Sequence, residues 1–442
     1  MEFGSLVPKI PKLLKDSSVD NISRLPDEIL SHIFSFLSTV EVVRTSILSK
    51  RWKHVWSLAP NLDFNDHFGF SPVDEAKFRL FKDYVDNVLF HHGGLDIKKF
   101  CLQCATSPHI YAWISAVLSC NVEELTIKSS FIDTCKELPW NLFTCKTLVS
   151  LRIDGGFILN LPYYVCFPCL KKLHLDSLIY VDDSSMQRLF SSCLVLEELY
   201  LRRARGDCVV IANIMIPSLK RLYLFVPTLE LLANHDYKTN INAPYLELLQ
   251  ISDSASKNYS VNFSVSLVEA QILGRCPFLL EGISNVQVLK LSGETMENWH
   301  SLNSKWPTFH NLFHLELGLS HLDGWKLLSH LLNSSPNLET LGLVEPIGYG
   351  GYSYGFYWIP PDSVPVCLLE CLESIEIHNF ADRRCEIFLV KYMLLHAEVL
   401  EELTIHWRSD IKCSKKTELV SSIQQEILNI PRRSEGCEIK FI

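Results

Sequence analysis

The stretch Leu196-Glu197-Glu198-Leu199-Tyr200-Leu201 decides the fold of this chain, because its spacing of apolar residues recurs about a dozen times. In each copy, an apolar residue at position i is followed by others at i+3 and i+5, and the last two lie on one face of a short strand. The copy that begins at Leu267 is weak, because an alanine takes its middle position. The other copies are Ile97/Phe100/Leu102, Val122/Leu125/Ile127, Leu148/Leu151/Ile153, Leu170/Leu173/Leu175, Leu219/Leu222/Leu224, Leu246/Leu249/Ile251, Val286/Leu289/Leu291, Leu312/Leu315/Leu317, Leu338/Leu341/Leu343, Leu372/Ile375/Ile377 and Leu400/Leu403/Ile405.

The intervals between the copies indicate leucine-rich repeats. From Val122 to Leu246, successive copies begin 26, 22, 26, 23 and 27 residues apart, inside the ~20 to 29 residues typical of this repeat. One repeat cannot bury its own apolar edge, so neighbouring repeats must stack into a solenoid. The sequence therefore predicts an α/β fold over residues 95–345, with a curved parallel sheet on the concave face and helices and irregular segments on the convex face.

One convex helix can be placed from the sequence. Asp182 and Ser184 suit a helix N-terminus, and Met186, Leu189 and Phe190 follow at helical spacing. No regular asparagine follows the triplets. The turn ladder of strict repeats is therefore missing, and we expect uneven curvature.

Residues 22–65 depart from the repeat and predict three short helices. Pro26 suits a first helical turn, and a wide apolar stripe follows it. Ser38 and Glu41 have the spacing of a capping box that opens a second helix, and Ser49 is expected to cap a third. About forty residues cannot bury such a stripe alone. The excess apolar surface must meet the end of the solenoid or another protein.

Three ordered pieces of this module carry a resemblance. They are Leu25-Pro26-Asp27-Glu28-Ile29-Leu30, Ile33-Phe34-Ser35-Phe36-Leu37 and Thr45-Ser46-Ile47-Leu48-Ser49-Lys50-Arg51-Trp52 with Trp56. Together they resemble an F-box in its plant form. The alternative is a three-helix cap on the solenoid, which explains the hydrophobicity but not the Leu-Pro and Ser-Lys-Arg-Trp pieces.

The resemblance implies docking on a Skp-type adaptor, which links the chain to a cullin and a RING protein in an SCF ubiquitin ligase. The chain itself would then perform no chemistry. Trp52 and Trp56 are expected to pack toward the repeats. An apolar centre with a charged rim agrees with the anatomy of a protein interface. Transferred residue by residue, the adaptor contacts are Leu25, Pro26, Ile29, Leu30, Val43, Leu48 and Ser49.

The C-terminal part begins with an aromatic, glycine- and proline-rich loop at residues 346–364. Three pieces follow within residues 365–442, Cys371-Leu372-Glu373-Ser374-Ile375-Glu376-Ile377, Glu386-Ile387-Phe388-Leu389-Val390-Lys391-Tyr392-Met393-Leu394 and Leu400-Glu401-Glu402-Leu403-Thr404-Ile405. They resemble the FBD domain of plant F-box proteins, which accompanies repeats of this kind. The resemblance departs from the family at Phe380, where Ala381 stands in place of the usual glycine. The FBD supplies no activity, and we interpret it as the terminal cap that a solenoid needs.

A target can be expected on the concave face, because residues that alternate with the buried triplets project into it. Aromatic residues and arginines dominate interface hot spots. We therefore predict target-binding positions at Arg152, Lys172, His174, Tyr200, Arg202, Arg221, Tyr223 and Phe225. The four lysine and arginine residues would form a basic track suited to an acidic peptide. The alternative is a solvated face of mixed charge.

No cofactor is predicted for this face. Some plant F-box repeat receptors hold an inositol phosphate beneath their substrate, but their arrays are longer and more closed. Whether this chain binds an inositol phosphate is left undecided by the sequence.

Three chemical motifs carry no predicted chemistry. The nucleophile-elbow pattern around Ser353 lies among glycines and precedes Pro360, so no buried strand enters it. The pairs Cys101/Cys104 and Cys166/Cys169 are too far apart for a typical zinc module. His91-His92 has no acidic or cysteine partner nearby and is interpreted as a surface turn. The sequence predicts no catalytic, cofactor or metal site.

Composition narrows the class further. The net charge of -9 argues against a nucleic-acid binder, and no apolar run reaches the roughly 18 residues of a membrane span. Residues 1–21 are expected to form a flexible tail without a signal peptide. Fifteen scattered cysteines favour reduced thiols in the cytoplasm or nucleus.

These observations together predict a substrate receptor of an SCF-type ligase that binds a protein target through its repeats. The alternative is a repeat scaffold that binds partners without engaging the ligase. A hydrolase using Ser353 is disfavoured. The identity of the target, and any modification or small molecule that gates its binding, do not follow from the sequence.

Overall fold

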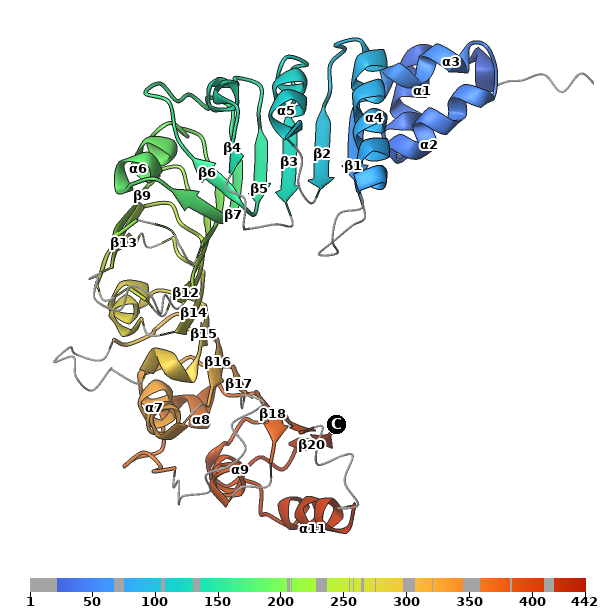
Figure 1. Ribbon diagram of the computed structural model, residues 1–442. Helices are drawn as coiled ribbons and strands as arrows, with labels where there is room; N and C mark the ends of the chain where they lie inside the picture. The colour runs from blue at the N-terminus through green and yellow to red at the C-terminus, as the bar shows by residue number, and fades with distance from the viewer. Residues whose placement is uncertain are drawn as a thin grey trace, which may run out of the picture.

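The computed structural model describes residues 22–66, 75–104, 108–129, 136–204, 207, 209–227, 237–253, 255–256, 258–263, 266–274, 276–296, 307–319, 321–344, 358–381, 384–408 and 417–442. They form an open arc with a long parallel sheet on its inner side and most helices on its outer side (Figure 1). The helical N-terminal module lies at one end of the arc. The fold confirms the α/β solenoid that the triplets predict.

The long sheet is parallel throughout, and its strands follow one another in chain order. Strands β4 (Lys136–Glu137) and β6 (Phe157–Leu159) form a small side branch that joins the sheet through β7. The strands of the inner sheet are β1 (Asn61–Asn65), β2 (Lys99–Cys104), β3 (Glu124–Ser129), β5 (Ser150–Asp154), β7 (Lys172–Tyr180), β8 (Glu198–Arg203), β10 (Arg221–Val226), β12 (Leu248–Asp253), β14 (Glu269–Gly274), β15 (Val288–Leu291), β16 (His314–Gly318), β17 (Thr340–Val344), β18 (Ser374–Phe380), β19 (Glu402–Trp407) and β20 (Glu438–Phe441).

The apolar triplets hold the strands in register. Leu199 of β8 is paired with Leu173 on one side and with Leu222 on the other, and the same pairing of triplet positions continues along the sheet. Even the weak copy obeys it, because Ala270 is paired with Leu249 and is fully buried. A parallel strand can stack its side chains only with those directly beside it, so the repeat spacing fixes the alignment.

Helices cover much of the outer side, and the expected convex helix is present. It is α6 (Asp183–Ser191), whose N-cap Asp182 accepts a hydrogen bond from the backbone N–H of Ser185 at 2.7 Å. The N-terminal module consists of η1 (Ile22–Arg24), α1 (Asp27–Phe34), α2 (Thr39–Arg44), η2 (Thr45–Ile47), α3 (Trp52–Val55) and η3 (Trp56–Leu58). The remaining helices are α4 (Glu75–His92), α5 (Ile110–Leu118), η4 (Trp140–Thr144), η6 (Pro277–Ile283), η7 (Gly293–Met296), α7 (His321–Ser334), α8 (Val366–Glu370), α9 (Arg384–His396) and α11 (Thr417–Leu428).

The convex side also contains a second parallel sheet that the sequence did not predict. Its strands are β9 (Ile211–Met215), β11 (Lys238–Ala243) and β13 (Asn258–Phe263), with β11 in the middle. Each of the three follows a strand of the inner sheet, so three successive repeats have a strand where a helix or an irregular segment was expected. Their alternation of buried and exposed residues is short and interrupted by asparagine, which weakens the strand signal.

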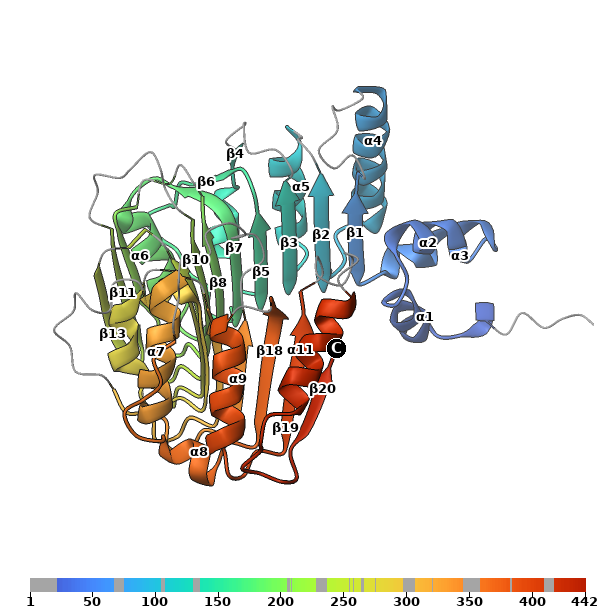
Figure 2. The ribbon, with the colours of Figure 1, turned by 90° about the horizontal axis from the view of Figure 1, so that it is seen from below.

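The inner sheet is longer than the predicted repeat region at both ends. At the N-terminal end, the sequence assigned residues 61–65 to the helical module, but they form strand β1, which pairs with β2. At the C-terminal end, strands β18, β19 and β20 of the segment that resembles an FBD continue the same sheet. Seen from below, β1 to β5 and β18 to β20 form the two arms of the arc (Figure 2).

Two predicted segments lie outside the described residues, in whole or in part. They are the tail at residues 1–21 and most of the loop at residues 346–364, including Ser353. None of the helices in the described part of the chain is long and apolar enough to cross a membrane.

Candidate functional site

Helix α1 presents apolar side chains on two sides. Leu30 and Phe34, four residues apart, are fully buried in the core of the module. Ile29 and Ile33 each precede one of them and are exposed, Ile29 to 47%. One turn of a helix separates residues i and i+4, so each pair forms its own stripe. The inner stripe completes the core of the module, and the side chains of the outer stripe stay exposed.

The residues predicted to contact an adaptor fall into three groups. Pro26, Ile29 and Leu48 are exposed, and Leu48 is exposed to 65%. Leu25, Val43 and Ser49 are partly buried. The Leu30 side chain is fully buried in the core, so the prediction that it contacts an adaptor is wrong. A helix turns about 100° per residue, and that step separates Leu30 from Ile29.

Sequence reasoning missed other exposed apolar side chains of the module. Ile33 and Phe36 continue the outer stripe of α1, and Ile47 beside Leu48 is exposed to 86%. The sequence contained a pattern that could have revealed them, because Ile29, Ile33 and Phe36 are spaced by four and three residues and so lie on one side of a helix. We call Pro26, Ile29, Ile33, Phe36, Ile47 and Leu48 the outer apolar surface.

The module that carries this surface is braced internally. The predicted capping box is present: the backbone N–H of Ser38 donates to the Glu41 carboxylate at 2.9 Å, and the Ser38 side chain accepts from the Glu41 N–H. The Ser38 backbone and side-chain hydrogen bonds lower the pKa of Glu41 from its ordinary value. Arg51 pairs with Asp27 and donates to the Leu25 carbonyl, which ties the start of α1 to the start of α3.

The module is also fastened to the arc. The backbone N–H of Thr39 donates to the carboxylate of Asp63 on β1 at 2.8 Å, and the Asp63 N–H donates to the Thr39 hydroxyl. Trp56 packs against His91 of α4, as expected for a residue that faces the repeats. Trp52 is also buried, and its ring makes an edge-to-face contact with Phe34 inside the module. The outer apolar surface is thus held in a fixed position on the arc.

The predicted target-binding residues come together on the concave face. They lie on four successive strands, β5, β7, β8 and β10, and Arg152, His174, Tyr200 and Tyr223 share one register row. The His174 and Tyr200 rings stack 3.9 Å apart, and the Tyr200 ring lies 5.1 Å from that of Phe225. We call His174, Tyr200, Tyr223 and Phe225 the aromatic cluster. Burial, with the Glu198 carboxylate as a further cause, raises the pKa of Tyr223.

The cations around the aromatic cluster are paired, which corrects the basic track expected from the sequence. Arg152 lies 2.8 Å from Asp154, Arg202 lies 3.6 Å from Asp176, and Glu198 contacts both Arg221 at 3.1 Å and Lys172 at 4.0 Å. Arg202 also lies over the Phe225 ring. Three carboxylates thus compensate the four cations, and the face matches the mixed-charge alternative, with aromatic rings at its centre.

Asp154 interacts with two side chains of this network, those of Arg152 and His174. Burial raises its pKa, but the side chains of His174 and Arg152 outweigh burial and hold the pKa below its ordinary value. Asp154 is therefore a carboxylate in this surface at neutral pH. A polyanion such as an inositol phosphate would have to displace carboxylates of this kind from the cations, so the arrangement does not favour one.

The cysteine and histidine pairs noted in the sequence do not take part in either of the two possible ligand clusters found among the described residues. Cys101 and Cys104 lie three apart on β2, so their side chains point to opposite faces of the sheet. Cys166 is partly buried and Cys169 exposed, and no disulfide joins any of the twelve cysteines that the structure describes. The histidine pair ends helix α4 rather than forming a surface turn, and His92 is buried with its Nε2 3.2 Å from the Ala59 carbonyl.

Comparison with known proteins agrees with this architecture. The F-box family model matches residues 22–64, and the FBD family model matches residues 360–405. A family model described as "FBD-associated F-box protein At5g56370, LRR repeats" matches residues 110–343. An F-box module on a leucine-rich-repeat arc supports the substrate-adaptor role that is typical of SCF ligases.

Relatives of full length come from Arabidopsis thaliana. The FBD-associated F-box protein At5g56370 is 32% identical over 96% of this chain and 100% of its own length. The F-box/LRR-repeat protein At2g42730 is 31% identical over 95% and 97%, and the F-box/FBD/LRR-repeat protein At5g56420 is 30% identical over 96% and 99%. The chain belongs to this family of plant F-box proteins with leucine-rich repeats and an FBD.

Proposed function

We propose that this chain is the substrate-recognition subunit of an SCF-type E3 ubiquitin ligase. Its F-box would dock on a Skp-type adaptor, which links it to a cullin and a RING protein, and its repeats would bind the protein to be ubiquitinated. The observation that carries the proposal is the outer apolar surface, which is exposed on a module whose own core is already filled.

Docking through this surface follows from its energetics. Fully burying a side chain such as Ile29 or Leu48 contributes roughly 1.5 to 3 kcal/mol relative to leaving it in water. Apolar side chains concentrated on one small module mark an interaction site. The exposed chains of the rim, Asp27, Glu28 and Lys50, would stay in water when the apolar centre is covered. A protein surface with an apolar groove is therefore the expected partner.

The aromatic cluster supports a protein target on the concave face. Tyrosine and arginine are enriched among the residues that dominate binding energy, and the stacking of His174 on Tyr200 fixes both rings before a target arrives. Since the neighbouring cations are paired, the expected target presents an apolar or aromatic anchor with charges of both signs. The role assigned to the chain is binding and positioning, without catalysis.

Localisation follows from the thiols. Cysteines such as Cys120, Cys145 and Cys193 are buried and form no disulfide within the described part of the chain, which fits a reducing compartment. We infer the cytoplasm, the nucleus or both. Imaging of a fluorescent fusion in plant cells tests this inference, and accumulation in the secretory pathway would contradict it.

Co-purification with a Skp-type adaptor tests the adaptor arm. The double variant Ile29→Ala/Leu48→Ala should lose at least about tenfold in affinity, because two buried contacts of this size exceed 1.4 kcal/mol. A matched control is Tyr163→Ala/Tyr164→Ala, which removes two exposed aromatic side chains from outside the F-box and should bind as the unchanged chain does.

The result separates the two candidate functions. Binding that depends on Ile29 and Leu48 supports the ligase subunit. If the folded chain and both variants fail to bind any adaptor of the plant, the alternative applies, and the chain is a repeat scaffold that acts without the ligase.

A further inference from the structure

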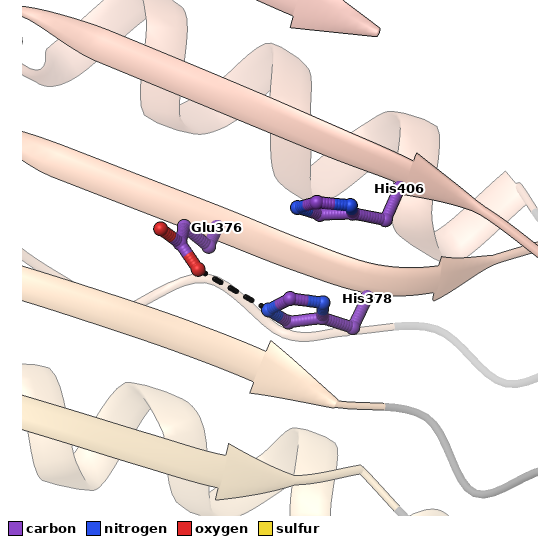
Figure 3. A group of neighbouring side chains, drawn as sticks. All are labelled: Glu376, His378 and His406. Carbon is purple, nitrogen blue, oxygen red and sulfur yellow. Dashed lines mark hydrogen bonds and ion pairs between the residues drawn. The ribbon is translucent and has the colours of Figure 1, made fainter. Parts of the chain in front are cut away.

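Glu376, His378 and His406 form a cluster on the C-terminal arm that the adaptor and target proposals do not use (Figure 3). Glu376 and His378 lie two residues apart on β18 and so share one face of the sheet, and His406 lies on the neighbouring strand β19. The Nε2 of His378 is 3.2 Å from Oε2 of Glu376, and the two imidazole rings stack with centroids 4.4 Å apart. The possible ligand atoms of the three residues all lie within 4.8 Å of one another.

The charge on Glu376 is compensated differently from that on other carboxylates of the concave face. Asp154 pairs with arginine, and Glu316 and Glu402 pair with lysine. The ion pair described for Glu376 is with His378, which carries a charge only when it is protonated. On the strand to the other side, the register partner of Glu376 is Gly342, which has no side chain. A bound cation would supply the compensating charge, and about half of the Glu376 side chain is accessible to it from solvent.

A second cluster offers a direct contrast. Asp154, His174 and Asp176 also place their ligand atoms within 4.8 Å of one another. Their carboxylates, however, are already paired with Arg152 and Arg202. A metal ion there would have to displace two guanidinium groups and lie beside their charge. The contrast leaves the Glu376 cluster as the one suited to a cation.

We propose that Glu376, His378 and His406 bind a divalent transition-metal ion such as Zn²⁺. Two imidazole nitrogens and one carboxylate oxygen form a donor set that zinc accepts, and three protein ligands leave a coordination position open. That position faces the concave side, where a side chain of a bound protein can complete the coordination. The site is independent of the proposed ligase function.

Binding requires a small rearrangement of the side chains. Bonds of ~2.0 to 2.2 Å to zinc place the ligand atoms of a tetrahedral site about 3.3 Å apart. The His378 and His406 rings lie within 13° of parallel, so one ring must turn before both nitrogens can point at one ion. Exposure leaves room for this, because 49% of the Glu376 side chain and 37% of the His378 side chain are accessible to solvent.

The test is a zinc titration of the full-length chain after treatment with a chelator, in competition with a chromophoric zinc indicator. Cysteines also bind zinc, so the quantity measured is the difference between variants. His378→Gln/His406→Gln should lose one equivalent of bound zinc, and Glu376→Gln should bind that equivalent at least about tenfold more weakly. Excess Mg²⁺ should not displace the zinc, because Mg²⁺ prefers oxygen ligands.

The matched control is His174→Gln, which removes a histidine from the second cluster and should bind zinc as the unchanged chain does. Two results would overturn the proposal. One is equal stoichiometry and affinity in the unchanged chain and in the double histidine variant. The other is loss of the equivalent in His174→Gln. Circular dichroism of each variant shows that the fold is intact.

Discussion

The repeat arc and the F-box are both rich in leucine and isoleucine, but the two regions place these side chains differently. In the arc, the triplet residues are aligned strand by strand and buried, as Leu199, Leu222 and Leu249 are. In the F-box, Ile29, Ile33 and Leu48 remain exposed on a module braced by polar contacts. Apolar residues therefore stabilise the fold of the arc, whereas those exposed on the F-box provide a surface for binding.

The largest loss of stability is expected when the buried ion pair between Arg203, at the end of β8, and Asp207 is broken. Two hydrogen bonds of 2.8 and 2.9 Å join them, and both side chains are almost completely buried. Arg203→Ala leaves the Asp207 charge buried alone and should lower the free energy of unfolding by about 3 to 5 kcal/mol. Urea unfolding of the variant and of the unchanged chain measures this difference in free energy. The pair Arg203→Met/Asp207→Leu should lose less than Arg203→Ala, and an equal or larger loss would contradict this account.

The next largest loss is expected in the aligned triplets. Leu224 of β10 is fully buried between its neighbours in the sheet. Leu224→Ala should cost about 2 to 5 kcal/mol, because it removes apolar contacts and leaves a cavity. Urea unfolding gives the value, and adaptor binding at a temperature where the variant is folded should be unchanged. A loss below ~1 kcal/mol would show that the ladder is not tightly packed.

A smaller loss is expected at the capping box of the F-box. Ser38→Ala should cost about 0.5 to 2 kcal/mol at pH 7. The pKa of Glu41 is lowered in the folded state, so the contribution of its carboxylate is present above the ordinary pKa of the group and is lost as pH falls through the folded value. The cost of Ser38→Ala should therefore shrink by pH 3. Unfolding measured at both pH values checks this, and a cost independent of pH would refute the role of the charge.

The smallest change in stability is expected on the outer apolar surface. Ile29→Ala/Leu48→Ala should change the free energy of unfolding by no more than about 0.5 kcal/mol per residue, as is usual for exposed positions. The same variant is expected to lose adaptor binding. Thermal unfolding measures the first quantity. A large destabilisation would place these side chains in the core and remove the contrast between the two regions.

The sequence predicted the parts of the fold that repeat and the parts that are local. The spacing of the apolar triplets predicted that Leu199 and its equivalents lie in register. The caps at Ser38 and Asp182 were predicted from the few residues around the start of each helix. It did not distinguish Ile29 from Leu30, because neighbouring residues of similar hydrophobicity differ only in which side of the helix is covered. The convex strands β9, β11 and β13 were missed because each is stabilised by its neighbours in the next repeats.

The candidate sites show the same division. Alternation along each strand placed Tyr200 and Arg202 correctly on the concave face. The partner of Arg202 is Asp176, a residue of the preceding strand, and such partners come from another repeat. His378 and His406 are likewise one repeat apart and become neighbours only through the register of β18 and β19. Pairings between repeats do not follow from the composition of any one repeat.

Strand β20 (Glu438–Phe441) is the outermost strand of the C-terminal arm among the described residues. It pairs with β19, and no further strand pairs with it among the described residues. An open strand edge is a template on which another chain can add a strand. Two of the residues of β20 are charged, Glu438 and Lys440, and Lys440 pairs with Glu438 and with Glu402 of β19. Charged side chains on β20 thus oppose the addition of a strand from a second copy of the chain.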